Sequence, residues 1–241
     1  MIVLFTDFGM EGPYTGQMKS VLIQRAPNNP VIDLFSNAPV HDPRASAYLL
    51  AAYIQDFPAD TVFVCIVDPG VGSDRKPVVV QVDGQWFVGP DNGLFNVIVR
   101  RGKAVQWWNI TWRPEKMTST FHGRDLFAPV AARLALGESP PGELQNVRER
   151  VDCSWPDEYA AIIYIDHFGN AMTGIRASSI SKECRLRVNN HTLSYARTFS
   201  DMAAGKAFWY RNANGLVEVA VNQGRADTLL KINAGNKVQL G

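Results

Sequence analysis

An almost unbroken apolar run, Thr-Val-Phe-Val-Cys-Ile-Val at residues 61–67, constrains the fold more than any other feature of the sequence. The run is too short to cross a bilayer and too continuous for a strand that has one face in water. Such runs are typical of parallel strands that helices cover on both faces. Ile2–Thr6 has the same character, and apolar residues recur at helical spacing along Tyr14–Arg25. This alternation predicts an α/β fold, a layered α/β/α domain with a mostly parallel sheet.

Further elements of this domain can be read from the same patterns. We expect strands at residues 31–35, 78–82 and 86–88, the last two joined by the hairpin signal Asp83-Gly84. We also expect a helix at 43–55, with proline in its first turn, and another at 126–136, ended by glycine.

The pattern of residue types in the sequence changes after residue 136. A turn-rich and irregular stretch leads to short β-type runs at 160–165, 186–188, 215–221 and 237–240, separated by Asn- and Gly-containing turns. This spacing is typical of a small β-barrel or sandwich. We therefore expect two domains, an α/β/α domain over residues 1–152 and a β-barrel domain over residues 158–241.

Composition excludes several classes of protein. Among 241 residues, 24 Lys and Arg face 23 Asp and Glu, and this balance leaves no basic surface for nonspecific nucleic-acid binding. Three scattered cysteines predict neither a disulfide framework nor a cysteine-rich zinc site. No run has the length of a membrane span, and the first residues do not resemble a signal peptide. We expect a cytoplasmic protein that binds neither membrane nor nucleic acid.

Asp68 is the first candidate functional residue, because it directly follows the 61–67 run. A carboxylate at the carboxyl end of an interior strand lies where α/β sheets bind ligands. Arg75 comes seven residues later and could fold back over this carboxylate and keep it ionised. The simpler alternative is that Asp68 only stabilises the Asp-Pro-Gly turn and that Arg75 forms a solvated surface pair.

Two other candidate residues are expected where a strand ends or a helix begins. His122, in the sequence Phe-His-Gly-Arg-Asp, opens the expected helix at 126–136, where backbone amides could face a ligand. Asp7 ends the first strand, where an acidic group commonly binds ribose hydroxyls. Each also has a purely structural alternative: a solvated histidine, a helix-terminal charge at Asp125, or a helix cap at Asp7. The chain lacks the dinucleotide-binding, Walker and zinc-protease motifs.

The order and spacing of several short motifs resemble the S-adenosylmethionine hydroxide adenosyltransferase family, which is related to fluorinating and chlorinating enzymes. The motifs that carry the resemblance are Thr-Asp-Phe-Gly at 6–9, Tyr-Thr-Gly-Gln-Met-Lys at 14–19, Asp-Pro-Gly-Val-Gly at 68–72, Gly-Pro-Asp-Asn-Gly-Leu at 89–94, Phe-His-Gly-Arg-Asp-Leu-Phe-Ala-Pro at 121–129 and Asp-His-Phe-Gly-Asn at 166–170.

The resemblance implies hydrolysis of S-adenosylmethionine to adenosine and L-methionine, without a metal or any cofactor besides the substrate. It also implies a homotrimer in which the C-terminal domain of one subunit completes the site of its neighbour. The family's water-activating residues fall on Asp68, Arg75 and His122. Its substrate-binding residues fall on Asp7 for the ribose, on Asp166, Phe168 and Asn170 for the methionine, and on Asn222 and Gln223 for the adenine.

This sequence departs from its halogenating relatives in ways that bear on the reaction. They carry Tyr, Thr, Tyr and Ser where this chain has Asp68, Val71, His122 and Gly123. The loss of those hydroxyl groups favours water over a halide as the nucleophile. Three other departures, at His41, Gly174 and Ala213, concern substrate affinity. A halide-dependent adenosyltransferase and a non-catalytic protein that binds S-adenosylmethionine or adenosine are the alternatives.

Overall fold

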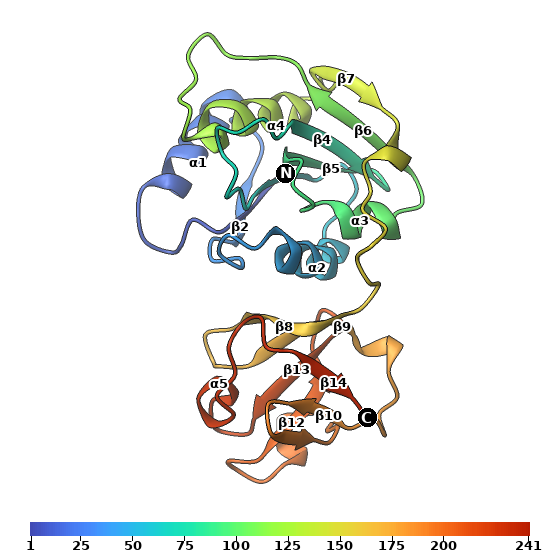
Figure 1. Ribbon diagram of the computed structural model, residues 1–241. Coiled ribbons are helices and arrows are strands. Elements are labelled where there is room, and N and C mark those ends of the chain that lie inside the picture. Colours follow the sequence, from blue (N-terminus) through green and yellow to red (C-terminus); the bar gives the residue numbers. More distant parts are fainter. The chain divides into compact units, whose positions relative to one another are not determined.

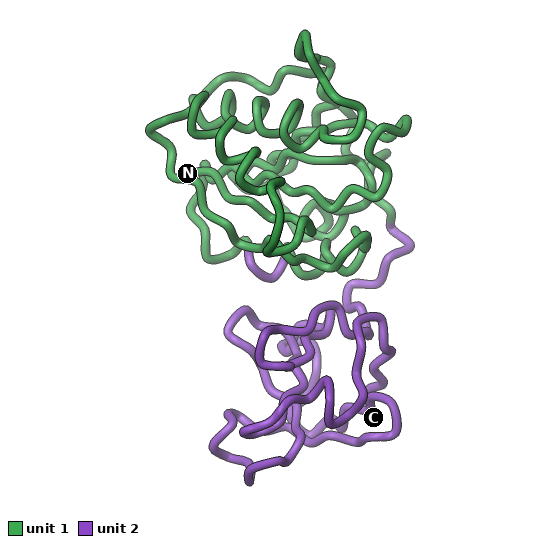
Figure 2. Tube along the Cα trace, turned by 90° about the vertical axis from the view of Figure 1, so that its left-hand side faces the viewer, with its two compact units in different colours: residues 1–50, 54–152 green, residues 51–53, 153–241 purple.

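The computed structural model describes residues 1–241 as two compact units (Figure 2). The first unit contains residues 1–50 and 54–152, and the second contains residues 51–53 and 153–241. Each unit has its own apolar core.

The first unit is built on a seven-stranded sheet in the order β2-β1-β3-β5-β4-β6-β7. Four neighbouring strands, β2, β1, β3 and β5, are parallel, while β4, β6 and β7 join them through antiparallel pairs. The strands are β1 (Ile2–Thr6), β2 (Val31–Phe35), β3 (Val62–Ile66), β4 (Pro77–Val82), β5 (Gln85–Pro90), β6 (Val105–Ile110) and β7 (Gly142–Gln145).

Helices cover both faces of this sheet, with α1 and α4 on one side and α2 on the other (Figure 1). The helices are α1 (Tyr14–Arg25), α2 (Pro43–Tyr53), α3 (Asn96–Arg101) and α4 (Ala128–Ala135), with a π-helix at Gly123–Phe127 and 3₁₀ turns at Ile54–Asp56 and Val147–Glu149. The predicted α/β/α layering of the N-terminal domain is therefore confirmed. Asp42 caps α2 by accepting a hydrogen bond from the amide of Ala45 at 2.9 Å, and Pro43 fits the first turn.

The apolar run at 61–67 forms β3, and every residue of that strand is buried. β3 lies between β1 and β5, as its continuous apolar character predicts. Thr6 is paired with Ile66 at the carboxyl ends of β1 and β3. The chain leaves both strands at the same edge of the sheet, and this register brings Asp7 and Asp68 to that edge.

The second unit contains two antiparallel sheets, in the orders β12-β13-β9-β8 and β11-β10-β14. Their strands are β8 (Tyr159–Ile165), β9 (Ala171–Arg176), β10 (Leu186–Val188), β11 (His191–Leu193), β12 (Ala207–Arg211), β13 (Leu216–Val221) and β14 (Val238–Leu240). A short helix, α5 (Ala226–Leu229), and 3₁₀ turns at Ala177–Ser179 and Phe199–Asp201 connect them. The region is thus built of β-strands, as expected, and they form antiparallel sheets.

The differences from the sequence-based expectation are local. The predicted helix at 126–136 begins earlier, as a π-helix that continues into α4. Five strands, β6, β7, β9, β11 and β12, and two short helices, α3 and α5, were not expected. The longest helix, α1, has 12 residues, and none of the helices has the length and apolar character needed to cross a membrane.

Candidate active site

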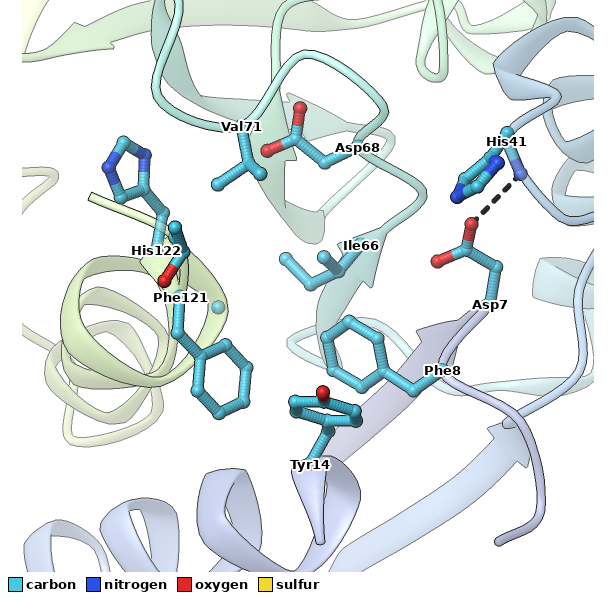
Figure 3. Close-up of a pocket in the computed structure, with 11 residues that line it drawn as sticks. Asp7, Phe8, Tyr14, His41, Ile66, Asp68, Val71, Phe121 and His122 are labelled. Atoms are coloured by element: carbon cyan, nitrogen blue, oxygen red, sulfur yellow. Dashed lines mark hydrogen bonds between the residues drawn. The ribbon is translucent and has the colours of Figure 1, made fainter. Parts of the chain in front are cut away.

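A cavity of about 310 Å³ lies at the carboxyl edge of the parallel strands in the first unit (Figure 3). It is lined by Asp7, Phe8, Tyr14, His41, Ile66, Asp68, Val71, Thr120, Phe121, His122 and Gly123. Three of the four residues that the sequence places in the N-terminal part of the site, Asp7, Asp68 and His122, therefore line one cavity. The fourth, Arg75, contacts two of them.

Arg75 joins Asp68 to His122. Its Nε donates a hydrogen bond to Asp68 Oδ1 at 3.0 Å, and its Nη2 donates to Asp68 Oδ2. The same Nη2 atom lies 2.9 Å from His122 Nδ1. Because a guanidinium has donors only, Nδ1 must act as the acceptor, and the proton of a neutral imidazole is then on Nε2.

The loop after β3 explains how Arg75 returns to Asp68. The amide of Val71 donates to the Asp68 carbonyl, and the amide of Ser73 donates to the Gly70 carbonyl, so two consecutive turns reverse the chain. Asn92 supports the start of this loop through a hydrogen bond to the Val67 carbonyl at 2.8 Å. The Asp-Pro-Gly-Val-Gly sequence therefore forms a turn, and this turn also brings the ion pair together.

The Asp68–Arg75 pair is buried, unlike an ordinary surface salt bridge. The Asp68 side chain is 5% exposed and that of Arg75 is 9% exposed. The Arg75 guanidinium also lies over the Phe127 ring, 5.3 Å from its centroid. Burial, and next the nearby charge of Arg75, lower the pKa of His122 below that of an ordinary histidine. The imidazole is thus largely uncharged at neutral pH, with Nδ1 accepting the hydrogen bond from Arg75.

Asp7 lies opposite this group. His41 donates its backbone amide to Asp7 Oδ2 at 3.0 Å (Figure 3). Burial raises the pKa of the Asp7 carboxyl, and the hydrogen bond from His41 opposes that effect. His41 has a φ of 55°, an uncommon conformation for a residue other than glycine. One oxygen of Asp7 is therefore held by the backbone, and the carboxylate remains on the cavity wall.

Aromatic rings form the apolar side of the cavity. Phe8, Tyr14 and Phe121 gather together in Figure 3, with ring centroids 5.4–5.8 Å apart. Gly123 completes this side, because a Cβ atom there would lie 3.2 Å from both Met18 Sδ and a Phe121 ring carbon. The cavity therefore combines carboxylates and an imidazole with a surface suited to a flat apolar group.

The substrate-binding positions expected in the C-terminal part lie in the second unit. Phe168, Asn170 and Gln223 line a separate open pocket of about 640 Å³ together with His167, Phe199, Tyr210, Val221, Gly224 and Arg225. Phe168 is 70% exposed, which is unusual for so large an apolar side chain.

Asp166 and Asn222, by contrast, do not line this pocket. Asp166 accepts two hydrogen bonds from Asn170, through its backbone amide at 2.8 Å and its Nδ2 at 3.0 Å. Asn222 donates its side-chain amide to the Met202 carbonyl at 2.7 Å. In the isolated unit, both side chains stabilise the turns that shape the pocket.

Sequence reasoning identified the polar residues of the first cavity and missed most of its apolar wall. Phe8, Tyr14 and Phe121 each stand inside a quoted motif, but nothing in the sequence shows that their rings meet. Residues 8, 14 and 121 belong to three separate segments that only the fold brings together. In the second unit, Phe199, Tyr210 and Arg225 were missed for the same reason.

No three His, Cys, Asp or Glu side chains of the structure lie together in an arrangement that could hold a metal ion.

Several known proteins are similar to this chain over nearly its whole length. The chain is 37% identical to an (R)-S-adenosyl-L-methionine hydrolase of Salinispora arenicola, over 98% of this chain and 95% of that protein. It is 35% identical to an (R)-S-adenosyl-L-methionine hydrolase of Thermus thermophilus, over 99% and 98% of the two chains. The crystal structure of an uncharacterized conserved protein from Thermotoga maritima matches with a TM-score of 0.89 and 29% identity, and the match covers 100% of both chains.

Family models match both parts of the sequence. The model of the SAM hydroxide adenosyltransferase N-terminal domain matches residues 2–144, and that of the C-terminal domain matches residues 160–239. These matches cover the sheet with its cavity and the antiparallel unit that follows. The chain therefore belongs to the SAM hydroxide adenosyltransferase family.

Proposed function

We propose that this protein hydrolyses S-adenosyl-L-methionine to adenosine and L-methionine, with water attacking the C5′ carbon of the substrate. The observation that carries the proposal is the buried Asp68–Arg75–His122 group on the wall of a cavity. The names of the two similar hydrolases give the substrate.

The chemistry of the substrate explains what such a group must do. The leaving group at C5′ is a sulfonium, which departs as a neutral thioether and needs no protonation. Catalysis must instead orient one water molecule in line with the C–S bond and accept its proton. The new C5′–O bond forms as the C5′–S bond breaks, the electron pair of that bond goes to sulfur, and one proton is released.

In this proposal Asp68 and His122 position the water and accept its proton. Arg75 fixes the orientation of both groups, because it donates to the carboxylate and to the imidazole Nδ1. The lowered pKa of His122 keeps its ring neutral, so Nδ1 can hold the Arg75 contact and Nε2–H can orient the water, and the ring can take a proton once that contact opens. Asp7 binds the ribose hydroxyls from the opposite wall, where carboxylates of α/β sheets commonly do so.

Two wall residues favour water over a halide. Val71 and Gly123 line the cavity and stand where the halogenating relatives carry Thr and Ser, as noted above. Neither side chain can donate a hydrogen bond to an anion, and Asp68 adds negative charge nearby. A halide ion would meet no hydroxyl donor at these two positions.

We further propose that the second unit binds the methionine and adenine parts of the substrate through Phe168, Asn170 and Gln223, with Asp166 and Asn222 supporting them. In the arrangement that the family resemblance implies, a homotrimer, these residues complete the site of a neighbouring subunit. Mixing inactive Asp68→Ala protein with inactive Asn170→Ala protein tests this, since exchanged trimers would contain some intact sites. Recovered activity is expected, and its absence after verified subunit exchange would oppose the arrangement.

Product analysis tests the proposed reaction. Purified protein is incubated with S-adenosylmethionine, with or without chloride or fluoride, and the products are separated by chromatography. We expect adenosine and methionine in equal amounts without halide. A halogenated adenosine would identify a halide adenosyltransferase, and tight binding without turnover would identify a non-catalytic binding protein.

A further inference from the structure

One wall of the first cavity comes from the start of the π-helix and from the irregular residues just before it. Thr120, Phe121, His122 and Gly123 provide four of the eleven lining residues. Residues 118–121 lie between β6 and the π-helix, outside any regular element. Some other set of contacts must fix this wall, since ordering a free segment when substrate binds would weaken affinity.

Asp125 provides these contacts through both of its carboxylate oxygens. Its Oδ2 accepts hydrogen bonds from the amide of Thr118 at 2.8 Å and from the hydroxyl of Thr118 at 2.7 Å. Arg124 donates from Nε to Oδ1 at 2.6 Å and from Nη2 to Oδ2 at 3.1 Å. The carboxylate therefore ties the start of the segment to the π-helix at its end.

Arg124 extends this connection to the cavity itself. Its guanidinium lies over the Phe121 ring at 5.2 Å, and Phe121 packs against Tyr14 at 5.4 Å. The segment also contacts the loop that carries Asp68. A Cβ atom at Gly72 would lie only 2.9 Å from the Ser119 carbonyl oxygen. Asp125 thus holds a segment that touches both the aromatic wall and the loop that carries Asp68.

We infer that Asp125 is a positioning residue, whose carboxylate fixes the 118–123 wall through Thr118 on one side and through Arg124 and Phe121 on the other. The inference rests on the proposed function, because it assigns a role in substrate binding. A negative charge near the start of a helix would explain Asp125 more simply, but that role requires neither the bond to the Thr118 hydroxyl nor the bidentate pair with Arg124. The surrounding donors lower the pKa of Asp125 to about 2, so the carboxylate stays ionised over the working pH range.

The expected effect of Asp125→Asn follows from this geometry. Asparagine replaces one carboxylate oxygen with an NH2 group, which would face either Arg124 Nε or the two Thr118 donors, so the bonds on one side of the carboxylate are lost. Substrate must then order the wall when it binds, and KM rises by about tenfold. The value of kcat stays within about threefold, because Arg75 still holds His122. A protein that was merely less stable would lose active molecules, and this loss would lower the apparent kcat without changing KM.

Glu138→Gln provides a matched control. Arg133 donates from Nε to Glu138 at 2.7 Å and lies over the Trp112 ring at 5.8 Å. This pair has the same chemistry as Asp125 and Arg124 but contributes nothing to the cavity lining. Both variants are compared with the wild-type full-length protein by steady-state kinetics and by hydrogen exchange read by mass spectrometry over residues 112–122.

Asp125→Asn should raise KM and accelerate exchange at the Thr118 amide, and added adenosine should restore much of the protection. Glu138→Gln should change neither quantity. Unchanged KM together with unchanged exchange in Asp125→Asn would overturn the inference. If that variant does not fold, Thr118→Val is used instead, because it removes only the hydroxyl bond to Asp125. This variant should raise KM by about threefold and accelerate exchange. Wild-type values of KM and exchange in Thr118→Val would overturn the inference.

Failure of the proposed function has a different signature. Wild-type protein would then not turn over S-adenosylmethionine, whereas exchange at Thr118 in the absence of ligand would still report whether Asp125 fixes the wall.

Discussion

The Nη2 atom of Arg75 lies 2.9 Å from Nδ1 of His122, and this one contact fixes which imidazole nitrogen can accept a further proton. With Nδ1 occupied as an acceptor, a neutral ring carries its proton on Nε2. Accepting a second proton would require His122 to give up this contact. In the proposed mechanism, Asp68 is then the more direct proton acceptor, and His122 orients the water and can take the proton when the contact with Arg75 opens.

Replacing Asp68 with asparagine should strongly reduce turnover. Asparagine keeps the size of the side chain but loses the charge and one acceptor, so Arg75 can no longer be held by two hydrogen bonds. We expect kcat to fall by about 100-fold or more, the contribution of a positioned acid–base group. Steady-state kinetics measures this loss, and circular dichroism verifies folding.

Asp33→Asn is the matched control for that variant. Asp33 lies on β2 of the same sheet and pairs with Lys19 at an exposed position, outside the cavity. Exposed pairs contribute little, so this variant should retain wild-type kinetics. Comparable losses in both variants would mean that Asp68 has no special role.

The pH dependence of the reaction should follow the lowered pKa of His122. Protonation of the ring at Nδ1 would break its contact with Arg75, so kcat/KM should decrease as pH falls through a value below the ordinary histidine pKa of about 6.5. Protonation is also more favourable in the unfolded chain than in the folded one, so His122 should lower the free energy of unfolding as pH falls from about 6.5 to the folded-state pKa, and add no further loss below it. An acid limb centred above pH 6.5, or one that persists unchanged in His122→Gln, would contradict this assignment.

Gly123→Ala should reduce affinity for the substrate. The new methyl group would lie 3.2 Å from Met18 Sδ and Phe121 and 3.4 Å from Phe8, so the aromatic wall must move. We expect KM to increase about fivefold with a stability loss of about 1 kcal/mol. Binding of adenosine, measured by calorimetry, reports the affinity directly.

Gly16→Ala serves as its control, since a Cβ placed there in α1 would meet no atom within 4 Å beyond its chain neighbours and the backbone of its own helix. Alanine should stabilise that helix by about 0.5–1 kcal/mol and leave KM unchanged. Equal affinity in Gly123→Ala and wild type would show that the wall tolerates the displacement.

The glycine at position 174 has a structural explanation. A Cβ atom there would lie 2.7 Å from Tyr159 Cβ and 2.8 Å from the Tyr159 carbonyl oxygen, where β8 and β9 pair. Replacing Gly174 with asparagine should therefore destabilise the protein by about 1–3 kcal/mol rather than improve binding. Thermal unfolding tests this, and an asparagine variant with wild-type stability would be the contrary result.

The sequence predicts this fold best where a pattern is local and strong. The run at 61–67 identifies a central strand, and the Asp83-Gly84 hairpin is observed with positive φ at both residues. β6 was missed because its aromatic residues, Trp107 and Trp108, carry no clear alternation with the polar residues around them. β9 was missed because Gly174 interrupts it.

The same distinction applies to the candidate site: residues at strand ends can be predicted, and contacts made by irregular or distant segments cannot. Strand ends identify Asp7 and Asp68, because the carboxyl ends of parallel strands meet at one edge. The bond between Thr118 and Asp125 depends on the path of an irregular segment, and the contact between Tyr14 and Phe121 joins residues far apart in sequence. Neither leaves a periodic pattern that sequence reasoning could use.

The most direct test of the central claim is to run the reaction in ¹⁸O-labelled water and weigh both products by mass spectrometry. Attack of water on C5′ predicts that one ¹⁸O atom enters the 5′-hydroxyl group of adenosine and that methionine stays unlabelled. Adenosine that forms without label, label that appears in methionine, or a complete absence of adenosine would contradict the proposed hydrolysis.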